Sequence, residues 1–273
     1  MARTMRAIGI KGGKGPADAL FVDTIPVPAP ASNQALIKVK AFGLNRMDLL
    51  QREGQYPVPP QAPSTLGVEF SGTIENFGDY AGKDFAVGDN VFGLAYGAGI
   101  QLSKADNASA IYVTAGSQEK IDFCVDKLGA TAGFNYRTQD WASEIQKATN
   151  GRGVDVVIDF VGATHFQGNL NVAARDGRIV QLGQMSGSTL PAGVDISGFI
   201  RKRLRFEGST LRSRDEQYQK KLRDLLVEHA LPKFKDGSFK IFIEKTFPFE
   251  QVAEAHKLLE SNRTKGKIIC TID

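Results

Sequence analysis

The feature that most constrains the fold is a change of rhythm near the middle of the chain. The first ninety-odd residues hold strand-like stretches rich in Val, Ile and Phe, separated by turns rich in Pro and Gly. From Ala110 onward, strand patterns alternate with helix patterns, and apolar runs such as VDVVIDFV fit parallel strands covered on both faces. The chain therefore predicts an antiparallel, barrel-like domain followed by a doubly wound α/β domain.

The expected elements follow these two patterns. In the β-rich part we expect a helix at 46–52 and strands at 5–11, 19–27, 35–41, 67–75 and 87–94. In the α/β part we expect strands at 110–115, 133–136, 154–161, 178–184 and 204–209. The tail predicts the helix DEQYQKKLRDLLVEHAL, then the strand FKIFIEKTF, the helix FEQVAEAHKLLESN and the strand GKIICTI. The expected domains are residues 1–97 with a C-terminal return at 239–273, and residues 98–238.

Composition narrows the functional classes. Cys124 and Cys270 form no C-x-x-C pair, and His165, His229 and His256 are scattered, so we expect neither a disulfide framework nor a metal site. No apolar run approaches the roughly 20 residues of a membrane span, and the N-terminal residues resemble no secretory signal. A net charge of +4 is spread along the chain. We expect a cytoplasmic protein that binds no membrane and no specific nucleic acid.

The segment TAGSQEK (114–120) predicts a nucleotide contact. A strand ends at Ala115, Gly116 makes the turn, and the helix that follows presents free N–H groups to an anion. An acidic residue at such a strand end selects NAD, but here Ser117 and Lys120 stand in its place, which favours the 2′-phosphate of NADPH. The alternative is an ordinary Ser N-cap with a surface Lys. Tyr136, at the end of the next strand, encloses the adenosine or simply caps the sheet.

Two further glycines lie where later strands end, Gly162 in DFVGA and Gly183 in QLGQ. Ligands of parallel sheets sit beyond the carboxyl ends of the strands, so these glycines would let a flat ring approach. Each is weak evidence alone, because helix starts also use glycine.

The segment LNRMDLLQREGQYP (44–57) predicts a substrate contact. Asn45, Asp48 and Arg52 fall on one face of a short helix, and Tyr56 follows it. One interpretation is an i, i+4 pair of Asp48 and Arg52 on a surface helix. The functional interpretation places Asn45 and Tyr56 in a substrate cleft as hydrogen-bond donors.

Taken together, these segments resemble the medium-chain dehydrogenase/reductase superfamily. The resemblance rests on NRMDLLQREGQYP, LGVEFSGTIENFG, VGDNVFG, GVDVVIDFVG and GKIICTI, and it covers nearly the whole chain. It is closest to the zinc-free quinone oxidoreductase branch, and TAGSQEK, LGATAGFNY, LRSRD and EAHK are most similar to the p53-inducible type of NADPH quinone oxidoreductase. Zinc-using relatives carry a Cys near the position of Asn45 and a His at that of Val68.

The resemblance implies a fold, an activity and a set of site residues. The fold is a GroES-like β-rich catalytic domain joined to a Rossmann-type nucleotide-binding domain. The activity is hydride transfer from NADPH to a quinone or similar electrophile, with Asn45 and Tyr56 by the nicotinamide. The residues implied at the adenosine 2′-phosphate end are Gly116, Ser117, Lys120 and Tyr136, and Lys265 also resembles a cofactor-side position. A homodimer is implied as well.

The chain departs from the family pattern after about Gly97. The first strand of the nucleotide domain and its Gly-rich turn are missing, a gap on the order of two βαβ-sized units of about 30 residues each. The strands ending TAGS and DFVG lose their shared neighbour, so they either pair directly or expose their edges. One conceivable rescue uses DNVFGLAYG as a replacement strand, with Gly97 to Gly99 as its turn. The alternative is that Gly97 to Gly99 form only a junction.

Two functions of different classes therefore stay open. One is an NADPH-dependent quinone oxidoreductase, and the other is a truncated, non-catalytic chain without effective NADPH binding. RNA binding by a basic surface is a weaker third hypothesis, because the sequence offers no dedicated motif.

Overall fold

The structure, a computed structural model, describes residues 3–56, 58, 65–79, 85–93 and 99–273. The chain forms two compact units, one made of residues 1–97 with 236–273 and the other of residues 98–235. Within the described residues, no helix combines the length and apolar character needed to cross a bilayer.

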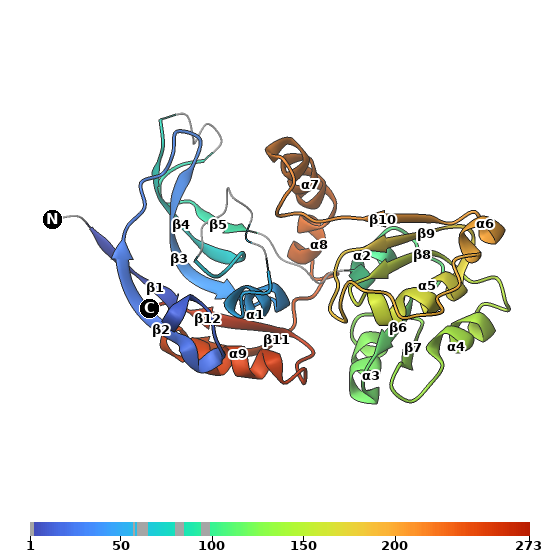
Figure 1. The fold of residues 1–273 in the computed structure, drawn as a ribbon. Helices are drawn as coiled ribbons and strands as arrows, with labels where there is room; N and C mark the ends of the chain where they lie inside the picture. Colours follow the sequence, from blue (N-terminus) through green and yellow to red (C-terminus); the bar gives the residue numbers. More distant parts are fainter. Residues whose placement is uncertain (1–2, 57, 59–64, 80–84, 94–98) are drawn as a thin grey trace. The chain divides into compact units, whose positions relative to one another are not determined.

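The first unit is built mainly of strands. Its elements are β1 (Thr4–Ile10), β2 (Leu20–Pro26), β3 (Ala35–Gly43), α1 (Arg46–Arg52), β4 (Phe70–Phe77), β5 (Asn90–Gly93), β11 (Ile243–Pro248), α9 (Val252–Glu260) and β12 (Lys267–Thr271), with 3₁₀ turns at Lys11–Gly13, Ala17–Ala19 and Phe249–Gln251. A five-stranded sheet runs in the order β11-β12-β3-β4-β5, and β1 pairs with β2 separately (Figure 1).

The sequence predicted an antiparallel sheet in this unit, and one pair of its strands departs from that prediction. β11 and β12 pair in parallel, because α9 connects them and a crossover of this kind returns the chain in the same direction. The other neighbours in this sheet are antiparallel.

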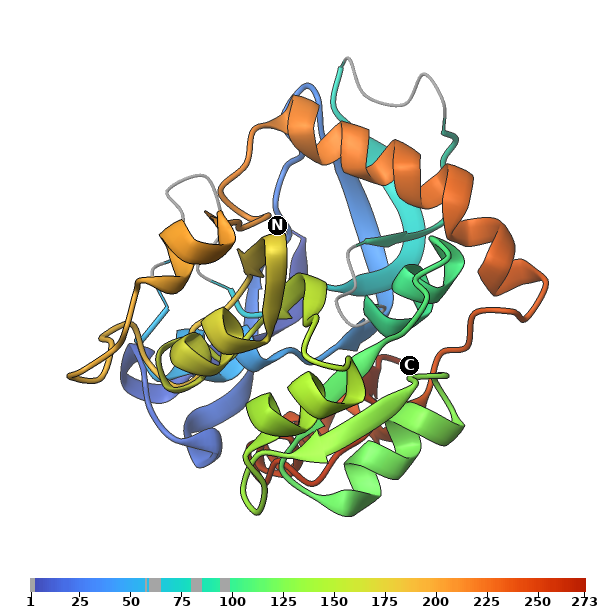
Figure 2. The ribbon, with the colours of Figure 1, turned by 90° about the vertical axis from the view of Figure 1, so that its right-hand side faces the viewer.

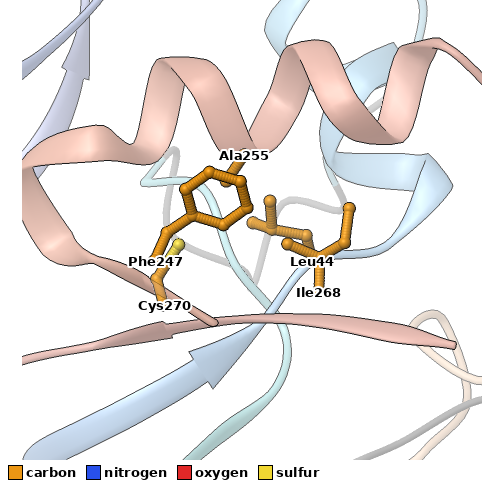
Figure 3. Packing of buried hydrophobic residues seen from close by; sticks show 5 residues of the cluster. All are labelled: Leu44, Phe247, Ala255, Ile268 and Cys270. Atoms are coloured by element: carbon orange, nitrogen blue, oxygen red, sulfur yellow. The ribbon is translucent and has the colours of Figure 1, made fainter. Parts of the chain in front are cut away.

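A compact apolar cluster joins these elements. Phe247, Ala255, Cys270, Leu44 and Ile268 are buried together (Figure 3). The Phe247 ring lies beneath Ala255 of α9, and the side chains of Leu44 and Ile268 meet beside it. Leu44 precedes α1 and Ile268 is the second residue of β12, so this cluster fixes the N-terminus of α1 against the start of β12.

The second unit alternates strands and helices. Its elements are α2 (Gly99–Ala105), β6 (Tyr112–Ala115), α3 (Gln118–Asp126), β7 (Ala132–Asn135), α4 (Trp141–Ala148), β8 (Val154–Asp159), a 3₁₀ turn (Ala163–His165), α5 (Phe166–Val172), β9 (Ala173–Gln181), α6 (Gly198–Lys202), β10 (Arg205–Gly208), α7 (Glu216–His229) and α8 (Leu231–Lys235). The predicted strands and helices are confirmed, with shifts of a few residues at most of their ends.

The parallel strands of this unit form two sheets rather than one. β6 pairs with β7, and β8, β9 and β10 form a second sheet in the order β10-β9-β8 (Figures 1 and 2). Among the described residues no strand pairs with the second edge of β6 or of β8. Of the two alternatives left open by the sequence, direct pairing is therefore wrong, and within the described parts of the chain the two edges have no partner.

The replacement strand proposed from the sequence is also wrong in its described part. Asn90–Gly93 forms β5, which pairs antiparallel with β4 in the first unit. Residues 94–98 of that segment lie outside the described residues, and Gly99 already begins α2.

The two faces of the three-stranded sheet differ. Val157, Ile179 and Phe206 lie side by side in the register and pack against α5 and α6. On the opposite face of β8, Val156 and Ile158 are each 46% exposed. A doubly wound sheet is normally covered on both faces. In this unit helices cover one face, and apolar residues of the other face are exposed.

Candidate functional site

The first candidate site surrounds Asn45 in the β-rich unit. Asn45 is the N-cap of α1, and its side chain makes two contacts. Its Nδ2 donates to Glu69 Oε2 at 2.6 Å, and its Oδ1 accepts from Lys267 Nζ at 2.7 Å. The third side of the triangle is an ion pair of 2.7 Å between Lys267 Nζ and Glu69 Oε2. An amide, a carboxylate and an ammonium group thus fix one another.

Local backbone features bring these three side chains together. Leu44 N donates to Ile268 O at 3.0 Å, and Gly43 N donates to Glu69 O at 3.3 Å. A Cβ atom on Gly43 would lie 2.9 Å from Glu69 Cδ and 2.9 Å from Lys267 Cε. Glycine at position 43 thus lets both side chains lie over the end of β3, and a Cβ atom there would displace their ends.

Asp48 lies beneath the triangle. Its Oδ2 accepts from Asn45 N at 2.7 Å, which is the reverse half of a capping box, and the side chain is buried. Burial raises the pKa of Asp48 to about 6, and the Glu69 charge adds to this, against the lowering effects of the backbone hydrogen bonds from Asn45 and Gly67 and of the Lys267 charge.

The surface pair of Asp48 and Arg52 expected as one interpretation is wrong. Both side chains are buried, and Arg52 turns away to other partners. Its guanidinium donates to Gly15 O at 2.9 Å and contacts His256 Nδ1 at 3.3 Å, and it forms ion pairs with Glu53 and Glu260. Arg52 is thus a buried residue that links α1 to α9 through hydrogen bonds and ion pairs.

Tyr56 and Lys265, the other predicted site residues of this unit, are positioned by hydrogen bonds of their backbone N–H groups. Tyr56 N donates to Leu50 O at 3.2 Å, which folds the chain back after α1, and the side chain is half-buried. Lys265 N donates to Glu244 Oε2 at 2.9 Å, just before β12. The structure brings Lys267, two residues further along, to Asn45. The sequence had indicated Lys265 and missed Lys267.

The second candidate site is the turn after β6. Gly116 leads into α3, and Ser117 is the N-cap of that helix. A Cβ atom on Gly116 would lie 2.7 Å from Tyr136 Oη and 3.0 Å from Arg137 Nε, so both side chains lie directly over the glycine. The ends of β6 and β7 are adjacent in the register, where Ala115 faces Asn135. The predicted residues Gly116, Ser117 and Tyr136 therefore gather at one sheet edge, with Lys120 one turn into α3.

Arg137 is the residue that the sequence analysis missed at this turn. Its side chain is exposed and forms no ion pair with any described residue. Its position directly after Tyr136, at the end of a strand neighbouring TAGS, was the signal available in the sequence.

Tyr136 packs against an aromatic stack formed by His165 and Trp141. The His165 ring stacks on Trp141 at 5.3 Å between centroids, and Tyr136 meets the same imidazole edge-on at 5.3 Å. Burial lowers the pKa of His165, against the opposing charge of Asp159, and so favours the neutral imidazole. His165 is thus a packing residue.

The two strand-end glycines serve close packing between loops. A Cβ atom on Gly183 would lie 2.8 Å from Phe160 O, and one on Gly162 would lie 3.1 Å from Gln184 Cα. Gly162 also has a φ of +85°, which disfavours other residues. The buried carboxylate of Asp159 accepts from Gly162 N and from Asn169 Nδ2 and so fixes the loop after β8. The approach of one loop to the other accounts for both glycines, and their contact with a flat ring stays a prediction.

Comparison with protein families gives two matches. A family model described as a zinc-binding dehydrogenase matches residues 128–270. A second, described as an alcohol dehydrogenase GroES-like domain, matches residues 31–138.

Individual relatives agree with these families. The chain is 25% identical to a quinone oxidoreductase of Lama guanicoe over 332 residues, covering 98% of this chain and 97% of the relative. The 332 aligned positions exceed the 273 residues of the chain by 59, so at least that many positions hold no residue of this chain.

Solved structures show the same fold. The quinone oxidoreductase of Escherichia coli complexed with NADPH matches with a TM-score of 0.78 at 21% identity, over 98% of this chain and 100% of that chain. An NAD-dependent alcohol dehydrogenase matches with a TM-score of 0.77 at 22% identity, over 98% of this chain and 100% of that chain.

Proposed function

Because the chain belongs to the medium-chain dehydrogenase/reductase superfamily, we propose that it is an NADPH-dependent quinone oxidoreductase. The reaction is hydride transfer from NADPH to a quinone or related electrophile. The relatives support a quinone as the substrate, since several of them are quinone oxidoreductases. The observation that carries the choice of cofactor is the turn at Gly116, where Ser117 stands in place of an acidic residue and Lys120 and Arg137 lie nearby.

The residues at this turn fit the 2′-phosphate of NADPH. Ser117 and the first N–H groups of α3 are hydrogen-bond donors, and Lys120 and Arg137 are cations. Arg137 can bind a phosphate through two N–H groups at once, and no described carboxylate competes for it. An NAD site would instead place an acidic residue where Ser117 stands.

The residues around Asn45 fit a substrate with a carbonyl oxygen and do not fit a metal ion. The donor set holds an amide, two carboxylates and an ammonium group, and the ammonium lies 2.7 Å from both Asn45 Oδ1 and Glu69 Oε2. Zinc prefers Cys and His ligands, and a positive charge at this distance repels a cation. Within the described residues no group of three His, Cys, Asp or Glu side chains could hold a metal.

When bound, NADPH supplies the hydride, and the protein supplies binding and orientation. Arg137, Lys120 and the turn at Gly116 hold the phosphate end. Asn45 and Tyr56 orient the substrate oxygen. No general base is required, because the electron pair arrives with the hydride.

A second candidate, a chain without effective NADPH binding, is favoured by one specific observation. β6 and β8 form no pairs with each other, and no described strand lies between them. A dinucleotide's pyrophosphate normally rests on the turn after the strand at that place. If that turn supplies two or three charge-assisted hydrogen bonds, its loss removes about 3–9 kcal/mol. We therefore expect NADPH to bind at least a hundredfold more weakly than to a complete relative.

The experiment is an NADPH-oxidation assay with a small ortho-quinone and the purified chain. We expect a rate that is proportional to protein concentration and saturates with NADPH. Arg137→Gln should raise the KM for NADPH by about 10- to 100-fold, as expected for a lost hydrogen bond to a charged group. Arg175→Gln, a change at another exposed arginine, should leave it unaltered. Folded protein that gives no rate above the blank would favour the non-enzymatic candidate.

Homodimer formation and a cytoplasmic location are further parts of this proposal. Both rest on the resemblance to the family. Light scattering of the purified chain tests the dimer, and cell fractionation tests the location.

A further inference from the structure

A pocket of the first unit lies between α9 and β11, outside both candidate sites. β11 is the end strand of the five-stranded sheet, and α9 follows it in the chain (Figure 1). The pocket has a volume of about 440 Å³, which is within the range of small-molecule binding sites. Its lining residues come from these two elements and the 3₁₀ turn between them: Lys245, Phe247, Gln251, Glu254, Lys257 and Leu258.

The strand contributes an ammonium group and an aromatic ring. Lys245 and Phe247 are two residues apart on β11, so their side chains lie on the same face of the strand. Phe247 lies beneath Ala255 of α9, so this face is turned toward the helix (Figure 3). Lys245 Nζ lies 4.7 Å from the centroid of the Phe247 ring. A cation is therefore placed over an apolar base.

The helix contributes polar groups and one apolar side chain. Gln251, Glu254 and Leu258 are spaced by three and four residues, which places them on one face of α9. Leu258 is partly buried against the apolar cluster of this unit. Lys257 Nζ lies 2.6 Å from Asp18 Oδ1 and 2.8 Å from Glu254 Oε1. The charges of Lys257 and Glu254 are thus already paired with each other.

Two polar groups of the lining are not paired in this way. The Lys245 side chain is exposed, and no described carboxylate forms an ion pair with it. The amide of Gln251 forms no hydrogen bond with any described residue. Lys245 is therefore the lining charge that lacks a counter-ion within the described residues, and the Gln251 amide can supply a further N–H donor.

We propose that this pocket binds an aromatic carboxylate. The carboxylate accepts hydrogen bonds from Lys245 Nζ and from the Gln251 amide, and the ring packs on Phe247 and Leu258. Charge-assisted hydrogen bonds are stronger than those between neutral groups, so the anion is preferred to an uncharged ring of the same shape. No residue of the Asn45 site or of the turn at Gly116 lines the pocket, so the inference does not rest on the proposed function.

The test is an NMR titration of the full chain with 2-naphthoate, followed through the backbone amides. A ligand of this size and ordinary efficiency binds with a Kd of about 1 mM. We expect saturable shifts centred on the lining residues at about this concentration. The uncharged control, 2-naphthylmethanol, should bind at least threefold more weakly, because it lacks the carboxylate.

Four variants locate the contact. Lys245→Met should raise the Kd for 2-naphthoate at least threefold, a modest factor because an exposed ion pair is screened by solvent. Lys245→Arg keeps the charge and should stay within about twofold of the wild type. Gln251→Ala should raise the Kd about twofold through the loss of a neutral donor. Lys40→Met, at an exposed lysine of the same sheet, is the matched control and should have no effect.

The outcomes are distinguishable. Absence of saturation, shifts centred away from the lining, equal binding of the alcohol, or a Kd unchanged by Lys245→Met would each overturn the inference. Arg137→Gln should leave naphthoate binding unaltered, and a loss in that variant instead of Lys245→Met would assign the anion to the turn at Gly116. A wild type that oxidises no NADPH but binds naphthoate through Lys245 removes the proposed function and keeps the pocket.

Discussion

Lys267 Nζ and Asn45 Oδ1 lie 2.7 Å apart although the two residues are separated by 222 positions in the chain. The contact joins the N-cap of α1 to the first residue of β12, and the buried neighbours Leu44 and Ile268 hold the two backbones together (Figure 3). The candidate substrate site therefore depends on both ends of the first unit. Its integrity can be followed through stability as well as through activity.

Asp48 should make the first unit less stable as the pH rises. Burial raises its pKa from 3.8 to about 6, so between these values the folded protein keeps a proton that the unfolded chain has released. Stability contributed by this group is thus lost as pH rises through the window, by about 3 kcal/mol in total. Urea denaturation followed by circular dichroism should show wild type losing this amount relative to Asp48→Asn between pH 4 and pH 7. A constant difference between the two proteins would contradict the assignment.

His256 should act in the opposite direction. Burial, aided by the Arg52 charge, lowers its pKa from 6.5 to about 4. Between these two pH values the unfolded chain therefore binds a proton that the folded protein does not bind. Stability is therefore lost as pH falls, again by about 3 kcal/mol relative to His256→Asn. The two effects nearly cancel in the wild type. Its stability should change little between pH 4 and pH 6.5 on account of these groups, and each single variant should reveal a slope of opposite sign.

Arg52 should contribute to the stability of the first unit and not to that of the second. It is 1% exposed and holds Gly15, His256, Glu53 and Glu260. Arg52→Met should cost that unit about 3 kcal/mol, because hydrogen bonds to a charged group are lost and His256 is left without its donor. Trp141 reports only on the second unit, so the circular-dichroism transition should shift while the tryptophan transition stays. Arg46→Met, at an exposed neighbour, should shift neither. A common shift of both transitions would show that the two units unfold together.

The unpaired edge of β8 should make the protein self-associate. Val156 and Ile158 of β8 are each 46% exposed, the second edge of β8 has no strand partner among the described residues, and such edges pair with other chains. Ile158→Lys should lower the light scattering of concentrated samples without loss of stability, since the side chain points to solvent. Val157→Lys places the same charge against α5 and should unfold the second unit instead. Undiminished scattering by Ile158→Lys would place the association elsewhere.

Most helices and strands could be predicted from local patterns in the sequence. Val- and Ile-rich runs predicted β8 and β9, and the strand–turn–helix order of TAGSQEK predicted β6 and α3, because these signals depend only on neighbouring residues. The parallel pairing of β11 with β12 could be missed, since pairing partners are not encoded by either strand alone.

The site was less accessible from sequence for a related reason. Asn45 could be predicted as a candidate because it begins a helix with a recognisable motif, whereas Lys267 and Glu69 meet it only after the sheet has formed. Asp48 and Arg52 were expected to pair because they are four residues apart, but Arg52 reaches α9 instead. Arg137 lies over Gly116 through the adjacency of β6 and β7, which spacing along the chain does not reveal.

The most direct test of the central claim is a titration of the purified 273-residue chain with NADPH and with NADH, followed by energy transfer from Trp141 to the reduced nicotinamide. A cofactor bound at about 1 μM by a complete site would bind at about 0.2 mM after losing 3 kcal/mol. We predict saturable NADPH binding between about 0.1 and 1 mM, with NADH at least tenfold weaker if Arg137 and Lys120 bind the 2′-phosphate as proposed. Absence of saturation by NADPH, or equal binding of the two cofactors, would contradict the account.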